Sequence, residues 1–243
     1  MLHIDVQLLP ILSDNYVFIM VNLDPKLCVV VDPGDASPVQ TYLEQHQLKV
    51  EAILLTHHHG DHINGASELN KKWKAPIYAP AKNKLQIPFA THFVSEGQTI
   101  ELFGKNLKFE VLEVPGHTLG HIVFFERNKK WLFSGDVLFG LGCGRVFEGS
   151  MLQAFESLRR IKDLPNETSV FCTHEYTETN LCFSKKLTSS YELQKYEENL
   201  NRKRSLGLPS VPLDLGVEKK TNLFLMANDV ERFTYLRELR NQG

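Results

Sequence analysis

The chain has 243 residues, of which 42% are apolar, and its formal net charge is −2 at pH 7. A chain of this size can bury one large core and still carry a modest C-terminal extension. The near-balanced charge, with no basic stripe, argues against nucleic acid as a partner and favours a small-molecule substrate.

The sequence also argues against a membrane protein and a secreted one. No apolar run approaches the roughly 20 residues that a membrane span requires, and Met1–Pro10 lacks the basic and apolar regions of a signal peptide. The cysteines form no Cys-x-x-Cys pair, which is typical of reduced thiols in the cytoplasm. They are Cys28, Cys143, Cys172 and Cys182. We expect a cytoplasmic monomer that binds neither membrane nor nucleic acid.

Short β-branched runs dominate the first part of the chain. Val17–Val21 and Leu27–Val31 flank a turn-like segment and predict a hairpin. Ser37 followed by Pro38 predicts the N-cap and first residue of a helix. Ala52–Thr56 is an uninterrupted apolar run, which is the pattern of a buried strand.

Strands and helices alternate further along. Asp32–Asp35 predicts a break in the chain, and Ala66–Trp73 repeats apolar residues at helical intervals. Ser150 predicts the N-cap of a further helix. Additional strands are predicted near Ile77–Tyr78, Thr99–Phe103, Leu107–Val114, Ile122–Glu126, Trp131–Phe133 and Ser169–Thr173.

The composition becomes charged and helix-favouring after about residue 174. Tyr191–Arg204 predicts a helix, and Asn228, with Glu231 at the capping-box position, predicts the cap of a final helix. We therefore expect an α/β protein with a catalytic domain over residues 1–173 and a mainly helical C-terminal region over residues 174–243.

The segment Thr56–His62 is dense in metal-ligand side chains and directly follows the predicted buried strand. His57 and His59 can face one centre because alternate residues of an extended segment share a side. Asp61 and His62 follow at the point where a helix begins. Imidazoles combined with a carboxylate suit zinc, iron or manganese better than a metal that prefers thiolates.

Three more candidate ligands stand at the ends of predicted strands. They are His117, Asp136 and His174. Loops at strand ends are where a sheet scaffold holds catalytic groups. A lone histidine at such a place is more often structural, but three candidates added to the histidine loop are hard to explain by packing.

This order of motifs, His-x-His-x-Asp-His, Gly-His, Gly-Asp and His, resembles the metal signature of the metallo-β-lactamase superfamily over at least residues 10–180. The resemblance implies an αββα sandwich with a metal site at one edge. It implies that His57, His59 and His117 bind one divalent ion, that Asp61, His62 and His174 bind a second, and that Asp136 bridges both. Zinc is the expected metal, with iron or manganese as alternatives.

Two such ions share a water and lower its pKa towards about 7, so that hydroxide can attack a carbonyl carbon at neutral pH. A thiolate is a good leaving group, so a thioester requires no strong general acid. We expect Asp61 and Asp136 to be the catalytic carboxylates, with Asp61 also orienting the proton of the water. Cys143 has no histidine close to it in sequence, so a cysteine nucleophile is not expected.

Within the superfamily the chain resembles glyoxalase II, or hydroxyacylglutathione hydrolase. The segments that carry this resemblance are Asp14–Tyr16, Gly116–His121, Gly142–Gly149 and Thr173–Thr177. The resemblance implies hydrolysis of S-(2-hydroxyacyl)glutathione, S-D-lactoylglutathione in particular, to D-lactate and glutathione in methylglyoxal detoxification. It also implies that the C-terminal region helps to bind glutathione.

The same resemblance implies the substrate contacts, which are Arg145, Phe147, His174, Glu175 and Tyr176. Arg145 would pair with a glutathione carboxylate, and Tyr176 would hydrogen-bond the glutathione backbone. Met226 stands where relatives usually carry an arginine in the tail. Its candidate replacements are Lys219, Lys220 and Arg232.

Three alternatives remain open from the sequence. The first is a related hydrolase of another thioester, a lactone or a β-lactam, although many β-lactamases have a cysteine at the position of Asp136. The second is a single-iron sulfur dioxygenase, which would not require His62 and His174. The third is a binding module without catalysis, but such proteins typically lose ligands, and all seven are present here.

Overall fold

The computed structural model describes residues 3–242. Residues 1 and 2 of the predicted catalytic domain (1–173) and residue 243 of the predicted C-terminal region (174–243) lie outside the described residues. The described residues divide into two compact units. Unit 1 comprises residues 3–113 and 120–129, and unit 2 comprises residues 114–119 and 130–242. The chain therefore leaves unit 1 at residue 114 and returns to it at residue 120.

Unit 1 contains a mixed sheet in the strand order β1-β2-β3-β4-β5-β6. The strands are β1 (Ile4–Ile11), β2 (Asn15–Leu23), β3 (Lys26–Val31), β4 (Lys49–Leu54), β5 (Ile77–Pro80) and β6 (His92–Val94). β1, β2 and β3 pair antiparallel, and β3 to β6 run parallel. The predicted hairpin is confirmed as β2 and β3, and the predicted buried strand as β4.

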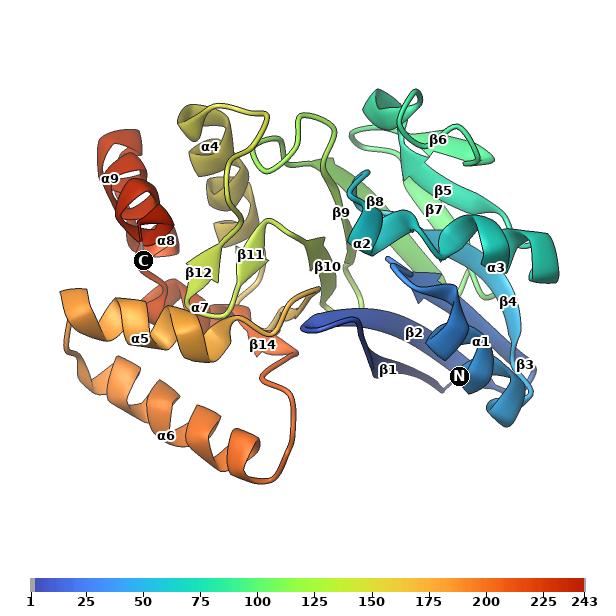
Figure 1. Cartoon of the computed structure of the whole chain (residues 1–243), viewed down its shortest axis with the longest axis horizontal. Helices are drawn as coiled ribbons and strands as arrows, with labels where there is room; N and C mark the ends of the chain where they lie inside the picture. The colour runs from blue at the N-terminus through green and yellow to red at the C-terminus, as the bar shows by residue number, and fades with distance from the viewer. Residues whose placement is uncertain (1–2, 243) are drawn as a thin grey trace. The chain divides into compact units, whose positions relative to one another are not determined.

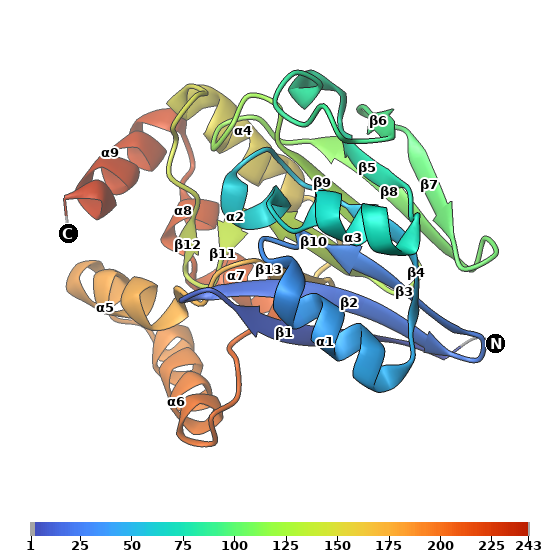
Figure 2. The same cartoon turned by 45° about the vertical axis from the view of Figure 1, so that its right-hand side comes forward.

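Helices α1 (Ala36–His46) and α3 (Ala66–Trp73) lie along one face of this sheet (Figures 1 and 2). Val39 and Leu43 of α1 and Leu69 of α3 are fully buried in one core with the strands. Burial of each such side chain is worth roughly 1.5–3 kcal/mol. This packing fixes the carboxyl end of β4, from which the histidine loop and the short helix α2 (Gly60–Ile63) continue.

Unit 1 also holds an antiparallel meander of β7 (Thr99–Leu102), β8 (Leu107–Glu113) and β9 (Ile122–Glu126). The Ile122 N–H at the start of β9 donates to the Thr56 carbonyl at 2.9 Å. This bond ties the meander to the first residue of the histidine loop. A short 3₁₀ turn, η1 (Ala81–Asn83), follows β5.

Unit 2 has strands of its own and most of the later helices. β10 (Trp131–Gly135) pairs parallel with β13 (Ser169–Cys172), which pairs antiparallel with β14 (Leu213–Asp214). β11 (Leu138–Phe139) and β12 (Gly142–Cys143) form a separate hairpin. The helices are α4 (Met151–Lys162), α5 (Thr177–Leu187), α6 (Tyr191–Ser205), α7 (Leu215–Thr221), α8 (Leu223–Met226) and α9 (Val230–Asn241).

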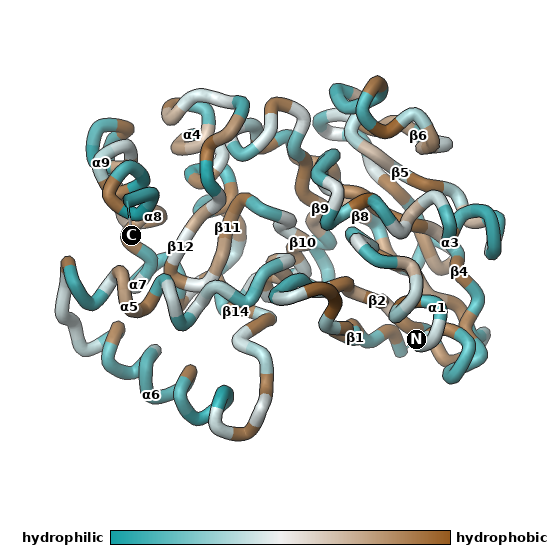
Figure 3. The backbone as a smooth tube through the Cα atoms, in the orientation of Figure 1, coloured by the Kyte–Doolittle hydropathy of each residue, from teal (hydrophilic) through white to brown (hydrophobic). Residues whose placement is uncertain are grey.

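The C-terminal part is mainly helical, as predicted. Helix α6 is polar along most of its length (Figure 3), and its buried residues are Leu193 and Leu200. Ser150 caps α4 in a capping box, as its position predicted. Among the described residues no helix is both long enough and apolar enough to cross a membrane.

Two predicted N-caps are wrong. Asp35 rather than Ser37 caps α1, because its carboxylate accepts a hydrogen bond from the Ser37 N–H at 2.9 Å. Pro38 then lies within the first turn, where its missing N–H costs no helical hydrogen bond. Asp229 rather than Asn228 caps α9, and it accepts from the Arg232 N–H at 2.7 Å.

Candidate metal centre

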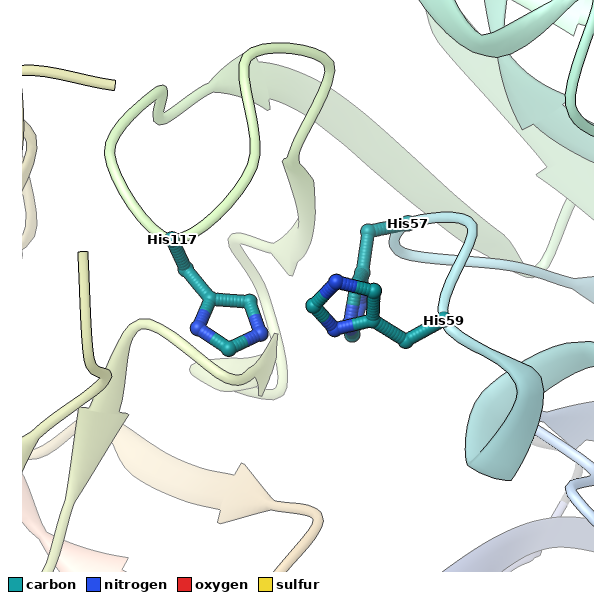
Figure 4. A group of neighbouring side chains, drawn as sticks. All are labelled: His57, His59 and His117. Atoms are coloured by element: carbon teal, nitrogen blue, oxygen red, sulfur yellow. The ribbon is translucent and has the colours of Figure 1, made fainter. Parts of the chain in front are cut away.

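The loop after β4 gathers several metal-ligand side chains in unit 1. The ring centroid of His57 lies 4.7 Å from that of His59 and 4.1 Å from that of His62. Figure 4 shows the His57 and His59 imidazoles leaving this loop, together with His117, a residue of unit 2. His57 and His62 are fully buried, whereas His59 and Asp61 are partly exposed. One short loop therefore brings three imidazoles into contact.

Asp32, the residue that follows β3, holds this loop in place through hydrogen bonds. Its Oδ2 accepts from the Thr56 hydroxyl at 2.6 Å and contacts His62 Nδ1 at 3.0 Å. Thr56 Oγ1 in turn lies 3.1 Å from His57 Nδ1. When Nδ1 of an imidazole is held in this way, Nε2 is left to bind a metal. Ligand atoms of Asp32, His57 and His62 lie within 4.8 Å of one another.

We expect Asp32→Ala to weaken zinc binding by about 10–100-fold, the usual effect of losing a carboxylate behind a histidine ligand. Competition with a chromophoric chelator measures this affinity. Asp35→Ala is the matched control, because it removes a nearby aspartate whose carboxylate caps α1. Equal zinc affinities for wild type and Asp32→Ala would contradict the role of Asp32.

Asp61 is held by a residue of β2. The Asn15 side-chain amide, which is 5% exposed, donates to Asp61 Oδ2 at 2.9 Å. Gly34 allows the two segments to approach, because a Cβ there would lie 1.9 Å from the Asp61 carbonyl oxygen. The Asp14–Tyr16 segment singled out in the sequence thus has a local function in unit 1, which is to orient the Asp61 carboxylate.

Unit 2 holds a second group of donors around Asp136. Asp136 Oδ2 lies 3.4 Å from His117 Nε2 and 3.4 Å from His174 Nε2, and all three side chains are buried. Asp136 Oδ1 accepts a 2.7 Å hydrogen bond from the Thr173 hydroxyl. One oxygen is therefore fixed by the protein, while the other faces two imidazoles.

The spacing of these atoms fits metal ligation. The Nε2–Oδ2 separation of His62 and Asp61 is also 3.4 Å. Good N–H···O hydrogen bonds are shorter, about 2.7–3.2 Å. Two ligands at about 2.05 Å from one tetrahedral ion lie about 3.3 Å apart. In each unit, the donor chemistry and its spacing fit a divalent ion.

His117 is oriented by the segment that follows β12. Its Nδ1 lies 2.8 Å from the Arg145 carbonyl oxygen, which can only accept, so Nδ1 carries the proton and Nε2 is left for a metal. Gly144 lies within this segment, and a Cβ there would sit 1.9 Å from the Asp136 carbonyl oxygen. The sequence Gly-Cys-Gly-Arg therefore packs directly behind the donors of unit 2.

Among the predicted substrate residues of unit 2, Phe147 and Tyr176 contact candidate metal ligands, whereas Glu175 binds Ser210. Phe147 is 60% exposed, and its ring lies 5.3 Å from that of His117. The Tyr176 ring stacks on His174 at 4.7 Å. Glu175 is engaged elsewhere, because its carboxylate accepts from both the amide and the hydroxyl of Ser210 at 2.8 and 2.6 Å.

Arg237 and Arg240 of α9, which the sequence did not predict as site residues, lie near Arg145, the predicted substrate contact after β12. Arg237 Nη1 donates to the Cys143 carbonyl at 2.8 Å. Burial, followed by the positive charges of Arg237 and Arg145, lowers the pKa of Arg240. Three guanidinium groups thus concentrate positive charge beside the β11–β12 hairpin, which favours an anionic partner.

Lys219 and Arg232, two of the residues suggested in place of the tail arginine, contact other parts of unit 2 than the Cys143 segment. Lys219 Nζ donates to the Leu164 carbonyl at 2.6 Å and to Asn166 Oδ1 at 2.7 Å. The Arg232 guanidinium lies 5.3 Å from the Tyr235 ring centre. Within unit 2, the arginines beside the Cys143 segment therefore lie on α9, with Arg240 in the last turn and Arg237 three residues before it.

Cys143 does not have the environment of a nucleophile. Its thiol is buried, and burial raises its pKa to about 11 despite the nearby Arg237. A cysteine nucleophile requires a lowered pKa, so that thiolate is present at neutral pH. The structure supports the expectation that the chemistry requires no cysteine.

Glu218 of α7 is a fully buried carboxylate, and burial raises its pKa from 4.5 to about 7 in spite of its hydrogen bonds with Tyr196, Leu141 and Asn222; nearby Asp214 adds to the rise. Between pH 4.5 and 7 the folded chain holds a proton that the unfolded chain has released. Stability therefore falls as pH rises through this window, by about 3 kcal/mol from this group.

Glu218→Gln removes this titration. We expect urea unfolding at pH 4.5 and pH 8 to show a loss of stability with rising pH that is about 3 kcal/mol larger in wild type than in the variant. The comparison cancels the histidines, which titrate in both proteins. Identical pH dependence in the two proteins would show that Glu218 titrates normally.

Comparison with known proteins agrees with these observations. A model described as the metallo-β-lactamase superfamily matches residues 13–174, and one described as the hydroxyacylglutathione hydrolase C-terminus matches residues 175–243. Crystal structures of the BLEG-1 B3 metallo-β-lactamase and of ETHE1 from Myxococcus xanthus are 24% and 23% identical, each with a TM-score of 0.71. They cover 92% and 96% of this chain, which covers 100% and 90% of theirs, and they show the fold.

Relatives of higher sequence identity show which family within the superfamily the chain belongs to. The hydroxyacylglutathione hydrolase of Bdellovibrio bacteriovorus is 51% identical over 246 residues, which cover 98% of this chain and 97% of the relative. That of Vibrio campbellii is 44% identical over 256 residues, which cover 98% and 99%. These relatives do not favour the alternative of a hydrolase for another thioester or a lactone. The chain has the metallo-β-lactamase fold and belongs to the hydroxyacylglutathione hydrolase, or glyoxalase II, family.

Proposed function

We propose that this chain hydrolyses S-(2-hydroxyacyl)glutathione, S-D-lactoylglutathione in particular, to D-lactate and glutathione with two divalent ions, zinc being the expected metal. The observation that carries the proposal is Asp136 Oδ2, 3.4 Å from the Nε2 atoms of both His117 and His174. The proposed ligands are His57, His59 and His117 for one ion, Asp61, His62 and His174 for the other, and Asp136 for both.

The roles of the side chains follow from their surroundings. When bound, the ion pair supplies a water acidic enough to be a nucleophile at neutral pH and positive charge for the carbonyl oxygen. Asp61, held by Asn15 and partly exposed, would orient the attacking water and take up its proton. Asp32 and Thr56 hold the imidazoles of His57 and His62 in one orientation. The thiolate of glutathione would leave without a general acid.

The glutathione half of the substrate would bind in the C-terminal region, residues 174–243, together with the segment after β12. The guanidinium groups of Arg145, Arg237 and Arg240 supply the charge that its carboxylates require. Tyr176, stacked on His174, would donate a hydrogen bond to the peptide backbone of glutathione. The catalytic domain of the proposal comprises residues 1–173.

The purified chain, loaded with zinc, should release glutathione from S-D-lactoylglutathione, as followed by a thiol reagent. An iron-loaded sample should show no oxygen consumption with a persulfide of glutathione, which separates hydrolysis from sulfur dioxygenase chemistry. Oxygen consumption without thioester hydrolysis would overturn the proposal. Hydrolysis of lactones in preference to thioesters would change the substrate class.

The cellular location is proposed from the cysteines alone. The four cysteine thiols are free in the structure, and reduced thiols are typical of the cytoplasm. We therefore propose a cytoplasmic protein. Its expected monomeric state stays a prediction, which sedimentation velocity tests.

A further inference from the structure

The β11–β12 hairpin is held by buried side chains of the helical region. Each residue from 139 to 143 has a backbone group hydrogen-bonded to such a side chain, at distances of 2.8–3.2 Å. The side chains are Asn180, Glu218, Asn222 and Arg237, each at most 5% exposed. A hairpin of two-residue strands has few ladder bonds of its own, so these contacts decide its conformation.

Glu218 lies at the centre of this network. Its Oε2 accepts from the Leu141 N–H at 2.8 Å and from the Asn222 side-chain amide at 3.0 Å. Its Oε1 accepts from the Tyr196 hydroxyl at 2.7 Å. Hydrogen bonds to an ionised acceptor are stronger than neutral ones, and more so in a buried site. One carboxylate therefore joins α6, α7 and the tip of the hairpin.

The hairpin tip needs such a clamp because Leu141 has a φ of +55°. This left-handed region disfavours a residue with a side chain, and it persists where the surroundings over-determine the backbone. The Leu141 side chain is fully buried among Leu181, Leu193 and Leu200. Packing holds the side chain, and the bond to Glu218 fixes the orientation of the peptide.

The hairpin leads directly into residues that surround the proposed glutathione site. Phe139 of β11 packs against His174 and Tyr176, with ring centroids 5.8 and 5.2 Å away. Beyond β12, Arg145 presents its carbonyl to His117 and its guanidinium to the surface. A shift of the tip would therefore displace aromatic and charged contacts together.

We propose that Glu218 is a positioning residue, which fixes the β11–β12 hairpin so that Arg145 and Tyr176 meet the glutathione half of the substrate. This inference rests on the proposed function and deepens it. Glu218 lies outside the proposed ligands and contacts none of them in the described structure, so its effect should fall on substrate binding rather than on the hydrolytic step.

The test is Glu218→Gln in the zinc-loaded full chain at pH 8. We expect the KM for S-D-lactoylglutathione to rise about 10-fold, kcat to change less than about twofold, and zinc content to stay at the wild-type value. S-lactoyl-N-acetylcysteamine has the same thioester and no carboxylate, and its kcat/KM should be unchanged. Hydrogen exchange of a peptide over residues 138–145 should quicken by about 10-fold or more.

Matched variants separate positioning from stability. Glu198→Gln removes an exposed acid of α6 and should leave all five readouts unchanged. Leu43→Ala destabilises the core of unit 1 and should lower the melting temperature without raising KM. Tyr196→Phe removes one donor to Glu218 and keeps the bond to Leu141, so it should raise KM by less than Glu218→Gln and serves if that variant does not fold.

An unchanged KM together with unchanged exchange would overturn the positioning role, as would an equal loss on both thioesters or a loss of zinc. The exchange measurement requires no substrate and so separates two failures. If wild type does not cleave the glutathione thioester, the proposed function fails, and the substrate part of this inference fails with it, even where the hairpin responds to Glu218→Gln.

Discussion

Asp136→Ala should lower kcat/KM for the glutathione thioester by about 10³-fold or more and reduce the metal content of the chain. The Asp136 carboxylate presents one oxygen at 3.4 Å to each of two imidazoles, while Thr173 holds the other oxygen. Loss of a ligand that, as proposed, holds both ions would remove several kcal/mol of stabilisation of the transition state, and about 1.4 kcal/mol corresponds to a factor of ten.

Elemental analysis and a thiol-release assay on the same samples measure both effects. Asp163→Ala, which removes an exposed aspartate at the end of α4, is the control and should behave like wild type. Thr173→Val should produce a smaller loss, because Asp136 keeps its charge but loses one hydrogen bond. Undiminished turnover in Asp136→Ala would contradict the assignment of this residue.

Arg240→Ala and Arg145→Ala should each raise the KM for the glutathione thioester by about 10–100-fold, with little change in kcat. A hydrogen bond to a charged group is worth about 1.5–3 kcal/mol, which corresponds to that range of affinity. The two guanidinium groups are close enough for the charge of Arg145 to lower the pKa of Arg240. Their effects on KM should therefore not be additive.

A substrate without carboxylates tests the origin of this effect. S-lactoyl-N-acetylcysteamine should be hydrolysed equally well by wild type and by both arginine variants. Arg202→Ala, on the exposed side of α6, is the matched control for loss of a positive charge. An equal loss on both substrates would mean that the arginines support the fold or the metal ligands rather than the carboxylates of glutathione.

Candidate ligands close together in sequence could be predicted because local geometry constrains them. The segment from His57 to His62 is one loop after a buried strand, so its side chains lie near one another in any fold that keeps that strand. His117, Asp136 and His174 were predicted from strand ends and from a family pattern. In unit 2 the structure brings these three together around one carboxylate oxygen.

Groups that act through another residue could not be predicted. Asp32 was interpreted only as part of a chain break, although it holds Thr56 and His62 from 24 and 30 residues away. Arg237 and Arg240 resemble ordinary helix-end cations until α9 is placed beside Cys143, 94 residues from Arg237 in sequence. Nothing local distinguishes these residues from solvated ones. For Asp32, the one signal in the sequence was its position directly after an apolar strand.

Secondary structure was missed where periodicity is weak. Strand β1 reads Ile-Asp-Val-Gln-Leu-Leu-Pro-Ile and mixes polar residues with a proline, which a sheet tolerates at an edge position such as the one β1 occupies. Helix α5 has no side-chain N-cap bond, and its buried positions include Asn180 and Ser184. Its buried face is therefore partly polar, so the apolar pattern of a helix is diluted.

As proposed, imidazoles and carboxylates of this chain hold two ions that make it a thioesterase. This proposal is tested most directly by titrating zinc into the metal-free chain while metal content and S-D-lactoylglutathione hydrolysis are measured on the same samples. We expect saturation at two ions per chain, with activity appearing in proportion to the doubly loaded form. Full activity at one ion per chain, or no thioester hydrolysis at two, would contradict it.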